Sequence, residues 1–133
     1  IGHDAAKTLR SLKLHLAKSD DLNTFTGYGE GYVMVNAVRY AHSVVVLPDR
    51  PVEAWAIAGV DTLREEDLNL MAGLGLEVVL LGTGKRPHFV HPRLLQSLAR
   101  ARVGVEVMDT QAACRTYNIL VAEGRKVAAA IIL

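Results

Sequence analysis

Residues 77–81 read EVVLL, a short run that is almost entirely apolar and stops at a Gly-Thr-Gly tripeptide. Such a run is typical of a strand that is covered on both faces, because a half-exposed strand would alternate polar and apolar side chains. A strand covered on both faces needs a layer of structure on each side of its sheet. The run therefore predicts a layered α/β domain in which residues 77–81 form a buried strand.

The second half of the chain alternates between strand-like and helix-like segments. Three helix starts are signalled: a capping box at Thr62 and Glu65, a proline at position 92, and an Asp-Thr pair at 109–110. The strand candidates that alternate with these helices are residues 52–57, 77–81, 103–108 and 126–133. Helical crossovers return the chain to the edge of the sheet from which it left. We therefore expect residues 52–57, 77–81 and 103–108 to run parallel.

The first half of the chain is richer in glycine, aromatic and β-branched residues. Residues 25–35, FTGYGEGYVMV, predict a ribbon that turns at Gly29-Glu30-Gly31, and residues 43–47 predict another strand. Residues 11–16 alternate between apolar and polar and also predict a strand, whereas residues 1–10 are expected to be a disordered or non-native extension. The whole chain, residues 1–133, is expected to be one domain with a largely parallel, helix-covered sheet and the ribbon as an extra layer or edge.

The composition argues against two classes of partner. Fifteen Lys and Arg residues are nearly balanced by 14 Asp and Glu residues. Dedicated nucleic-acid and membrane-surface binders carry a cationic patch, so neither partner is expected. The longest apolar runs are far shorter than the roughly 20 residues of a membrane-spanning helix, and membrane insertion is not expected. Cys114 is the only cysteine, which suits a reducing compartment. With no recognisable targeting segment and an alanine- and arginine-rich character, the expected location is the bacterial cytoplasm.

Topology predicts where a ligand site would lie. In open α/β sheets, ligands bind beyond the carboxyl ends of the parallel strands. Three strand exits are expected to share that edge: residues 59–61 (Gly-Val-Asp), 82–84 (Gly-Thr-Gly) and 108–110 (Met-Asp-Thr). The tentative ligand-binding residues are Gly82, Thr83, Gly84, Asp109 and Thr110, and Arg115 and Asn118 follow on the third expected helix.

The residues at 82–84 leave two interpretations open. Glycines allow close approach of a partner, and their amides can form an anion-binding nest. The segment GTGKRP nevertheless matches neither the P-loop pattern nor the dinucleotide fingerprint. It is either a tight strand exit without a ligand or a site for an anion or small molecule, with Lys85 or Arg115 as the anion partner. Arg115 and Asn118 have a structural alternative, in which they bind loop carbonyl groups and stabilise the fold.

The sequence predicts no catalytic residues, metal or cofactor. His88 and His91 have a spacing that metal ligands can have, but no carboxylate or cysteine lies near them in the sequence, and a zinc site needs three or four ligands. Cys114 is expected to lie beyond the first turn of its helix and to be buried and inert. No Gly-x-Ser-x-Gly nucleophile motif occurs. We therefore expect a non-enzymatic protein rather than an enzyme.

Several motifs together resemble a known family. They are Asn36, Trp55, Gly82-Thr83-Gly84, Asp109-Thr110, the run Arg-Thr-Tyr-Asn at 115–118 and Glu-Gly-Arg at 123–125. Over residues 22–133 the chain resembles the small α/β proteins of unknown biochemical function that include the mitochondrial NADH dehydrogenase (complex I) assembly factor 3. The resemblance rests on the combination of these motifs rather than on any one of them.

The resemblance implies a three-layer (β+α/β/α) domain with a mixed, largely parallel central sheet and an extra β-ribbon layer. It implies that one central strand, residues 126–133, is antiparallel to the others. It also implies no established catalytic activity, protein partners such as respiratory-complex assembly components, and a mitochondrial location in eukaryotic relatives. An interaction module would bind such a protein partner or a second copy of itself as a homodimer. The expected function is a non-enzymatic interaction or assembly module. The alternative is a small-ligand or anion-binding protein or enzyme with its site at residues 59–61, 82–84 and 109–110.

Overall fold

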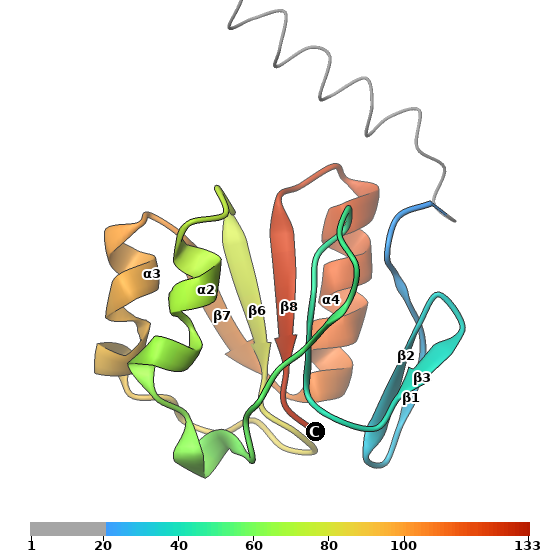
Figure 1. Cartoon of the computed structure of the whole chain (residues 1–133), viewed down its shortest axis with the longest axis horizontal. Coiled ribbons are helices and arrows are strands. Elements are labelled where there is room, and N and C mark those ends of the chain that lie inside the picture. The colour runs from blue at the N-terminus through green and yellow to red at the C-terminus, as the bar shows by residue number, and fades with distance from the viewer. Residues whose placement is uncertain (1–20) are drawn as a thin grey trace, which may run out of the picture.

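The computed structural model describes residues 21–133 (Figure 1). The strand predicted at residues 11–16 and the extension predicted at residues 1–10 lie outside the described residues. Within the described part, one five-stranded sheet and one three-stranded sheet flank a long helix, and two shorter helices cover the other face of the larger sheet (Figure 1). This arrangement is the expected three-layer α/β fold with an extra ribbon.

The five-stranded sheet is mixed. Its strands are β4 (Val44–Val46), β5 (Glu53–Ala54), β6 (Val78–Gly82), β7 (Gly104–Met108) and β8 (Val127–Ile131), in the order β5-β4-β8-β6-β7. β6 pairs in parallel with both β7 and β8, whereas β4 is antiparallel to β8 and to β5. β5 therefore runs in the same direction as β6 and β7, as predicted, although it is a two-residue strand at the sheet edge.

The expectation that the last strand is antiparallel is wrong. β8 pairs in parallel with β6, with Leu80 opposite Ala129, and the antiparallel strand is β4. The physical reason is the connection that leads into each strand. α4 (Thr110–Ala122) carries the chain from the end of β7 back to the edge where β7 began, so β8 must run the same way. No helix crossover precedes β4, which follows the ribbon directly.

The ribbon is an antiparallel sheet of β1 (Phe25–Gly29), β2 (Tyr32–Val35) and β3 (Val38–Tyr40). Its first turn is the predicted one, and Gly31 has the positive φ of +74° that favours glycine. The second turn uses Asn36 and Ala37, both at positive φ. The amide of Ala37 donates to the hydroxyl of Thr26 over 2.9 Å, which holds this turn against β1.

Two apolar cores lie on opposite faces of the larger sheet. Val79 and Leu81 of β6 face the core beneath the shorter helices, and Leu80 faces the core beneath α4 and the ribbon; all three are fully buried. The prediction that residues 77–81 form a strand covered on both faces is therefore confirmed for β6, which the structure begins at Val78.

The helix predicted from Thr62 is broken into short pieces: the 3-10 turns η1 (Val60–Thr62) and η2 (Glu65–Asp67), followed by α2 (Asn69–Ala72). The hydroxyl of Thr62 donates to the carbonyl of Gly59 instead of capping a helix. The indole Nε1 of Trp55 donates to the carbonyl of Asp67 over 3.1 Å. The break itself lies at Leu63 and Arg64, whose backbone is extended, and the amide of Arg64 donates to Oδ2 of Asp67 over 2.8 Å.

The other two helices begin where the sequence predicts. Pro92 opens the 3-10 turn η3 (Pro92–Leu95), which continues as α3 (Gln96–Arg100). Asp109 caps α4, and its side chain accepts from the amide of Ala112 over 2.9 Å. No helix in residues 21–133 is long and apolar enough to cross a membrane.

Candidate functional site

Backbone groups of the Gly-Thr-Gly exit of β6 form hydrogen bonds with three neighbouring segments. The amide of Thr83 donates to the carbonyl of Met108 over 2.9 Å, and the amide of Ile132 donates to the carbonyl of Gly82 over 2.8 Å. The amide of Gly84 donates to Oγ1 of Thr110 over 2.9 Å. The amides of Thr83 and Gly84, which an anion-binding nest would use, thus already have acceptors within the protein.

Thr110 joins the start of α4 to both sides of this exit. Its amide donates to the carbonyl of Gly84 over 2.8 Å, and its hydroxyl donates to the carbonyl of Ile132 over 2.8 Å while accepting from the Gly84 amide. A hydroxyl has one proton and two lone pairs, so these two bonds use its donor and one acceptor position. Thr110 is buried, which raises the cost of losing either bond.

Both glycines have a structural reason. A Cβ added to Gly82 would lie 3.1 Å from the Cα of Thr110 and 3.1 Å from Cδ1 of Ile131, so only glycine lets α4 begin this close to β6. Gly84 has a φ of +102°, a backbone conformation that is strained for any residue with a side chain. The close approach that the sequence indicated is therefore an approach of the protein's own helix.

Thr83 braces the loop that follows. Its side chain is buried, and its hydroxyl accepts from the amide of His88 over 3.1 Å. The hydroxyl proton faces two carbonyl groups, that of Arg86 at 2.9 Å and that of Met108 at 3.2 Å. The loop after β6 is thus held in shape by a side chain at its own base.

Arg115 and Asn118 face the ribbon. Oδ1 of Asn118 accepts from the amide of Phe25 over 2.9 Å, and its Nδ2 donates to the carbonyl of the same residue over 2.8 Å. Nη1 of Arg115 donates to the hydroxyl of Tyr28 over 3.2 Å. Asn118 therefore fits the structural alternative, although it binds β1 rather than the glycine-rich exits.

The predicted site residues are only partly brought together. Gly82, Thr83, Gly84 and Thr110 form one bonded cluster, and Asp109 caps the adjoining helix. The hydrogen bonds of residues 59–61 go to the turn that they themselves form, η1, rather than to this cluster. Of the three strand exits predicted to share one site, only residues 82–84 and 108–110 are joined by hydrogen bonds.

A small pocket opens beside the cluster. It has a volume of about 130 Å³, and its walls are residues 28–30 at the ribbon tip, 84–85 after β6, 110–111 at the start of α4, and 132–133. The sequence indicated the turn at residues 29–31, but no local pattern shows that the turn docks over this edge of the sheet. Tyr28, Glu30 and Gln111 were therefore not predicted as pocket residues.

The remaining candidate chemistries have structural roles. Cys114, on α4, is buried in the core that α4 shares with the sheet and the ribbon, and this burial raises the pKa of its thiol to about 12, which matches the expected inert cysteine. Nδ1 of His91 accepts from the amide of Arg93 over 3.1 Å and so caps η3. Among residues 21–133, no group of three or more His, Cys, Asp and Glu side chains is placed to hold a metal ion.

We expect the hydroxyl of Thr110 to be needed for stability more than its methyl group. Thr110→Val keeps the branched shape but leaves the Gly84 amide and the Ile132 carbonyl unpaired, which should cost about 2–4 kcal/mol. Thr110→Ser keeps the hydroxyl and should cost about 1 kcal/mol. Urea unfolding of the two variants tests this order. A Val variant as stable as the Ser variant would show that the bonds do not matter.

Asn118→Ala should loosen the ribbon, because the amide and carbonyl of Phe25 lose their partners at a half-buried position. The expected loss is about 2–3 kcal/mol of unfolding free energy. Asn69→Ala, at an exposed position that begins α2, is the matched control and should change stability by less than about 0.5 kcal/mol. Equal melting of the two variants would contradict the anchoring role.

Comparison with known proteins places this geometry in a family. The model of a family described as "Protein of unknown function (DUF498/DUF598)" matches residues 25–132. A curated relative from Mus musculus, named NADH dehydrogenase [ubiquinone] 1 alpha subcomplex assembly factor 3, is 38% identical over 90 residues, which are 66% of this chain and 48% of that protein. The chain spans about half the length of the first curated relatives that it matches, between 48% and 58%.

Solved structures share the fold over most of the chain. A crystal structure of a protein from Bordetella parapertussis is 47% identical, with a TM-score of 0.80, and the match covers 84% of this chain and 95% of that one. A solution structure of a Bordetella pertussis protein, described as a Mth938-like domain, is 39% identical, with a TM-score of 0.75 and coverage of 84% and 86%. With its three-stranded ribbon, mixed sheet and matched residues 25–132, the chain belongs to the DUF498/DUF598 family.

Proposed function

We propose that this chain is a protein-interaction module that supports the assembly of a respiratory NADH dehydrogenase in the bacterial cytoplasm. The observation that carries the proposal is the similarity to relatives named for this assembly role, at 38% identity in the mouse protein and 34% in the bovine one. The partners would be components of the respiratory complex, and the chain would act through its surface rather than through a reaction.

The geometry at the carboxyl edge of the sheet supports a non-catalytic role. The polar groups that sequence reasoning offered for chemistry are engaged within the protein: Thr83 in the loop, Thr110 between three segments, and Asn118 on β1. The one thiol is buried and its pKa is raised. A side chain that is fully bonded within the protein supports the fold and is a poor candidate for a nucleophile or a general base.

A deletion of the gene in its own host tests the proposal. We expect the amount of assembled NADH dehydrogenase, measured on native gels and as NADH-dependent quinone reduction, to fall several-fold and to return when the wild-type chain is supplied. Terminal oxidase activity is the control and should not change. Undiminished NADH dehydrogenase in the deletion strain would overturn the assembly role.

A second candidate function is the binding of a small anionic ligand in the pocket beside Gly84. The specific observation is the pocket itself, with Lys85 and Gln111 on its walls and an apolar floor at residues 132–133. At about 130 Å³ it accommodates a fragment of only a few heavy atoms, well below the 300–1,000 Å³ of drug-sized sites. Glu30 on the ribbon side opposes a strongly charged anion.

Amide chemical shifts test this second candidate. In a panel of inorganic phosphate, acetate and small carboxylates, binding should shift the amides of Lys85 and Gln111 in a saturable way. Lys85→Gln should weaken the response, whereas Lys126→Gln, an exposed cation before β8, is the matched control and should leave it unchanged. An unresponsive spectrum across the panel would eliminate the pocket as an anion site.

A further inference from the structure

The overall charge of +1 conceals a one-sided distribution along the chain. Residues 78–105 contain five Lys and Arg residues and no Asp or Glu, so the excess of acidic residues lies elsewhere. In the structure, Arg100 pairs with Glu65 over 3.3 Å. Among the described residues, Lys85, Arg86 and Arg93 take part in none of the ion pairs, which involve only Arg64, Arg100 and Arg125 as cations.

An almost fully exposed aromatic ring lies among these cations. The side chain of Phe89 is 84% exposed, the highest value among the large apolar residues of the described chain that face solvent. Residues 85–88 before it, Lys-Arg-Pro-His, are all exposed as well. We call residues 85–89 the tip loop. It follows β6 at the carboxyl edge of the sheet, where the arrowheads of β6 and β8 lie in Figure 1.

The tip loop is fixed at both ends. At its base, the hydroxyl of Thr83 accepts from the amide of His88 and donates toward the carbonyl of Arg86. Beyond it, Val90 is buried in the core beneath α2 and α3. The ring of His91 meets that of Phe89 edge-on, with 6.3 Å between centroids. The protein thus presents Phe89 outward on a braced loop instead of folding it into the neighbouring core.

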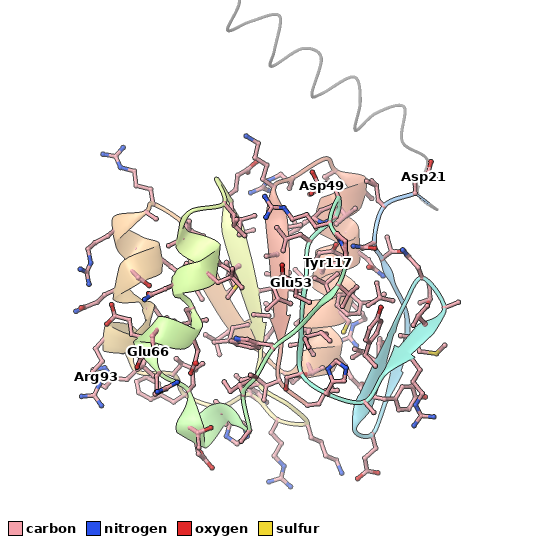
Figure 2. All side chains as sticks on the ribbon, viewed as in Figure 1. Asp21, Asp49, Glu53, Glu66, Arg93 and Tyr117 are labelled. Carbon is pink, nitrogen blue, oxygen red and sulfur yellow. The ribbon has the colours of Figure 1, made fainter. Side chains whose placement is uncertain are left out.

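We propose that the tip loop is a contact site for the surface of an anionic phospholipid membrane. Cations near an anionic bilayer are attracted to its surface potential, and an aromatic ring can enter the boundary between headgroups and acyl chains. Lys85 and Arg86 supply the charge and Phe89 supplies the apolar group, while Glu30, which lines the same pocket as Lys85, offsets part of the attraction. Arg93 lies on the flank of the molecule, near Glu66 in Figure 2, and is not part of this contact site.

The size of the loop favours a membrane over an acidic protein as the partner. A stable protein interface covers about 800 Å² on each side and has a core of several apolar or aromatic residues. The tip loop presents a single large apolar side chain, Phe89, to solvent. Such a group enters a bilayer boundary without a preformed pocket, and a few cations with one ring give weak, reversible, salt-sensitive binding.

Binding of the full chain to lipid vesicles tests the proposal. We expect co-sedimentation with vesicles of mixed phosphatidylglycerol and phosphatidylcholine, little with phosphatidylcholine alone, and release when salt is raised. Lys85→Glu/Arg86→Glu should weaken binding about thirtyfold or more, since each cation contributes about a factor of five. Phe89→Ala should weaken it by about tenfold or more.

A matched variant separates the loop from a general charge effect. Arg50→Glu/Lys126→Glu makes the same change in net charge at exposed positions; Lys126 precedes β8 and Arg50 follows β4, so both lie at the opposite edge of the sheet. This variant should retain at least half of the wild-type affinity. The proposal would be overturned if both double variants weakened binding equally, or if the chain did not bind the anionic vesicles. It would also be overturned if, in a parallel measurement, the chain bound a single-stranded oligonucleotide but not the vesicles.

Discussion

The close approach of α4 to the exit of β6 is the contact on which the carboxyl edge of this protein depends. Gly82 leaves no room for a side chain, since a Cβ there would meet the backbone of Thr110. The hydroxyl of Thr110 then joins the Gly84 amide to the Ile132 carbonyl. One residue therefore fixes the loop after β6, the start of α4 and the chain after β8 relative to one another.

That constraint decides what the edge can do. The topology of an open α/β sheet places ligands beyond these strand ends, yet here the amides of Thr83 and Gly84 bind the protein's own acceptors. What remains free lies further out: the ribbon tip, the side chain of Lys85 and the exposed ring of Phe89. Strand ends whose polar groups are bonded within the protein, with exposed side chains beyond them, suit binding to another surface better than catalysis on a bound substrate.

The ribbon is held to the rest of the fold in a similar way. Asn118 uses both ends of its amide on Phe25, and the hydroxyl of Tyr117 donates to the carbonyl of Asn23 over 3.0 Å. Figure 2 shows Tyr117 within the molecule, where α4 lies beside the ribbon, and its burial raises the pKa of the phenol. Arg115, Tyr117 and Asn118 thus bind α4 to the ribbon and to the segment that leads into it.

Local patterns in the sequence predicted the elements that local physics determines. The apolar run before Gly82 identified β6, and Asp109 with Thr110 identified the start of α4. The continuous helix expected from Thr62 does not form because Leu63 and Arg64 are extended, and a new turn starts after Arg64, whose amide donates to the carboxylate of Asp67 over 2.8 Å. The glycines at 82 and 84 signalled close approach, but spacing along the chain could not show that the approaching group is α4 rather than a ligand.

Hydrogen exchange at the Gly84 amide tests the central claim most directly. If this amide is held by the hydroxyl of Thr110, it should exchange about a hundredfold or more slowly than the adjacent amide of Lys85, for which the structure gives no acceptor among residues 21–133. The protection should persist when phosphate is added. Exchange of Gly84 as fast as that of Lys85 would mean that the amide is open to solvent, and the exit would then be an unfilled binding loop rather than a structural junction.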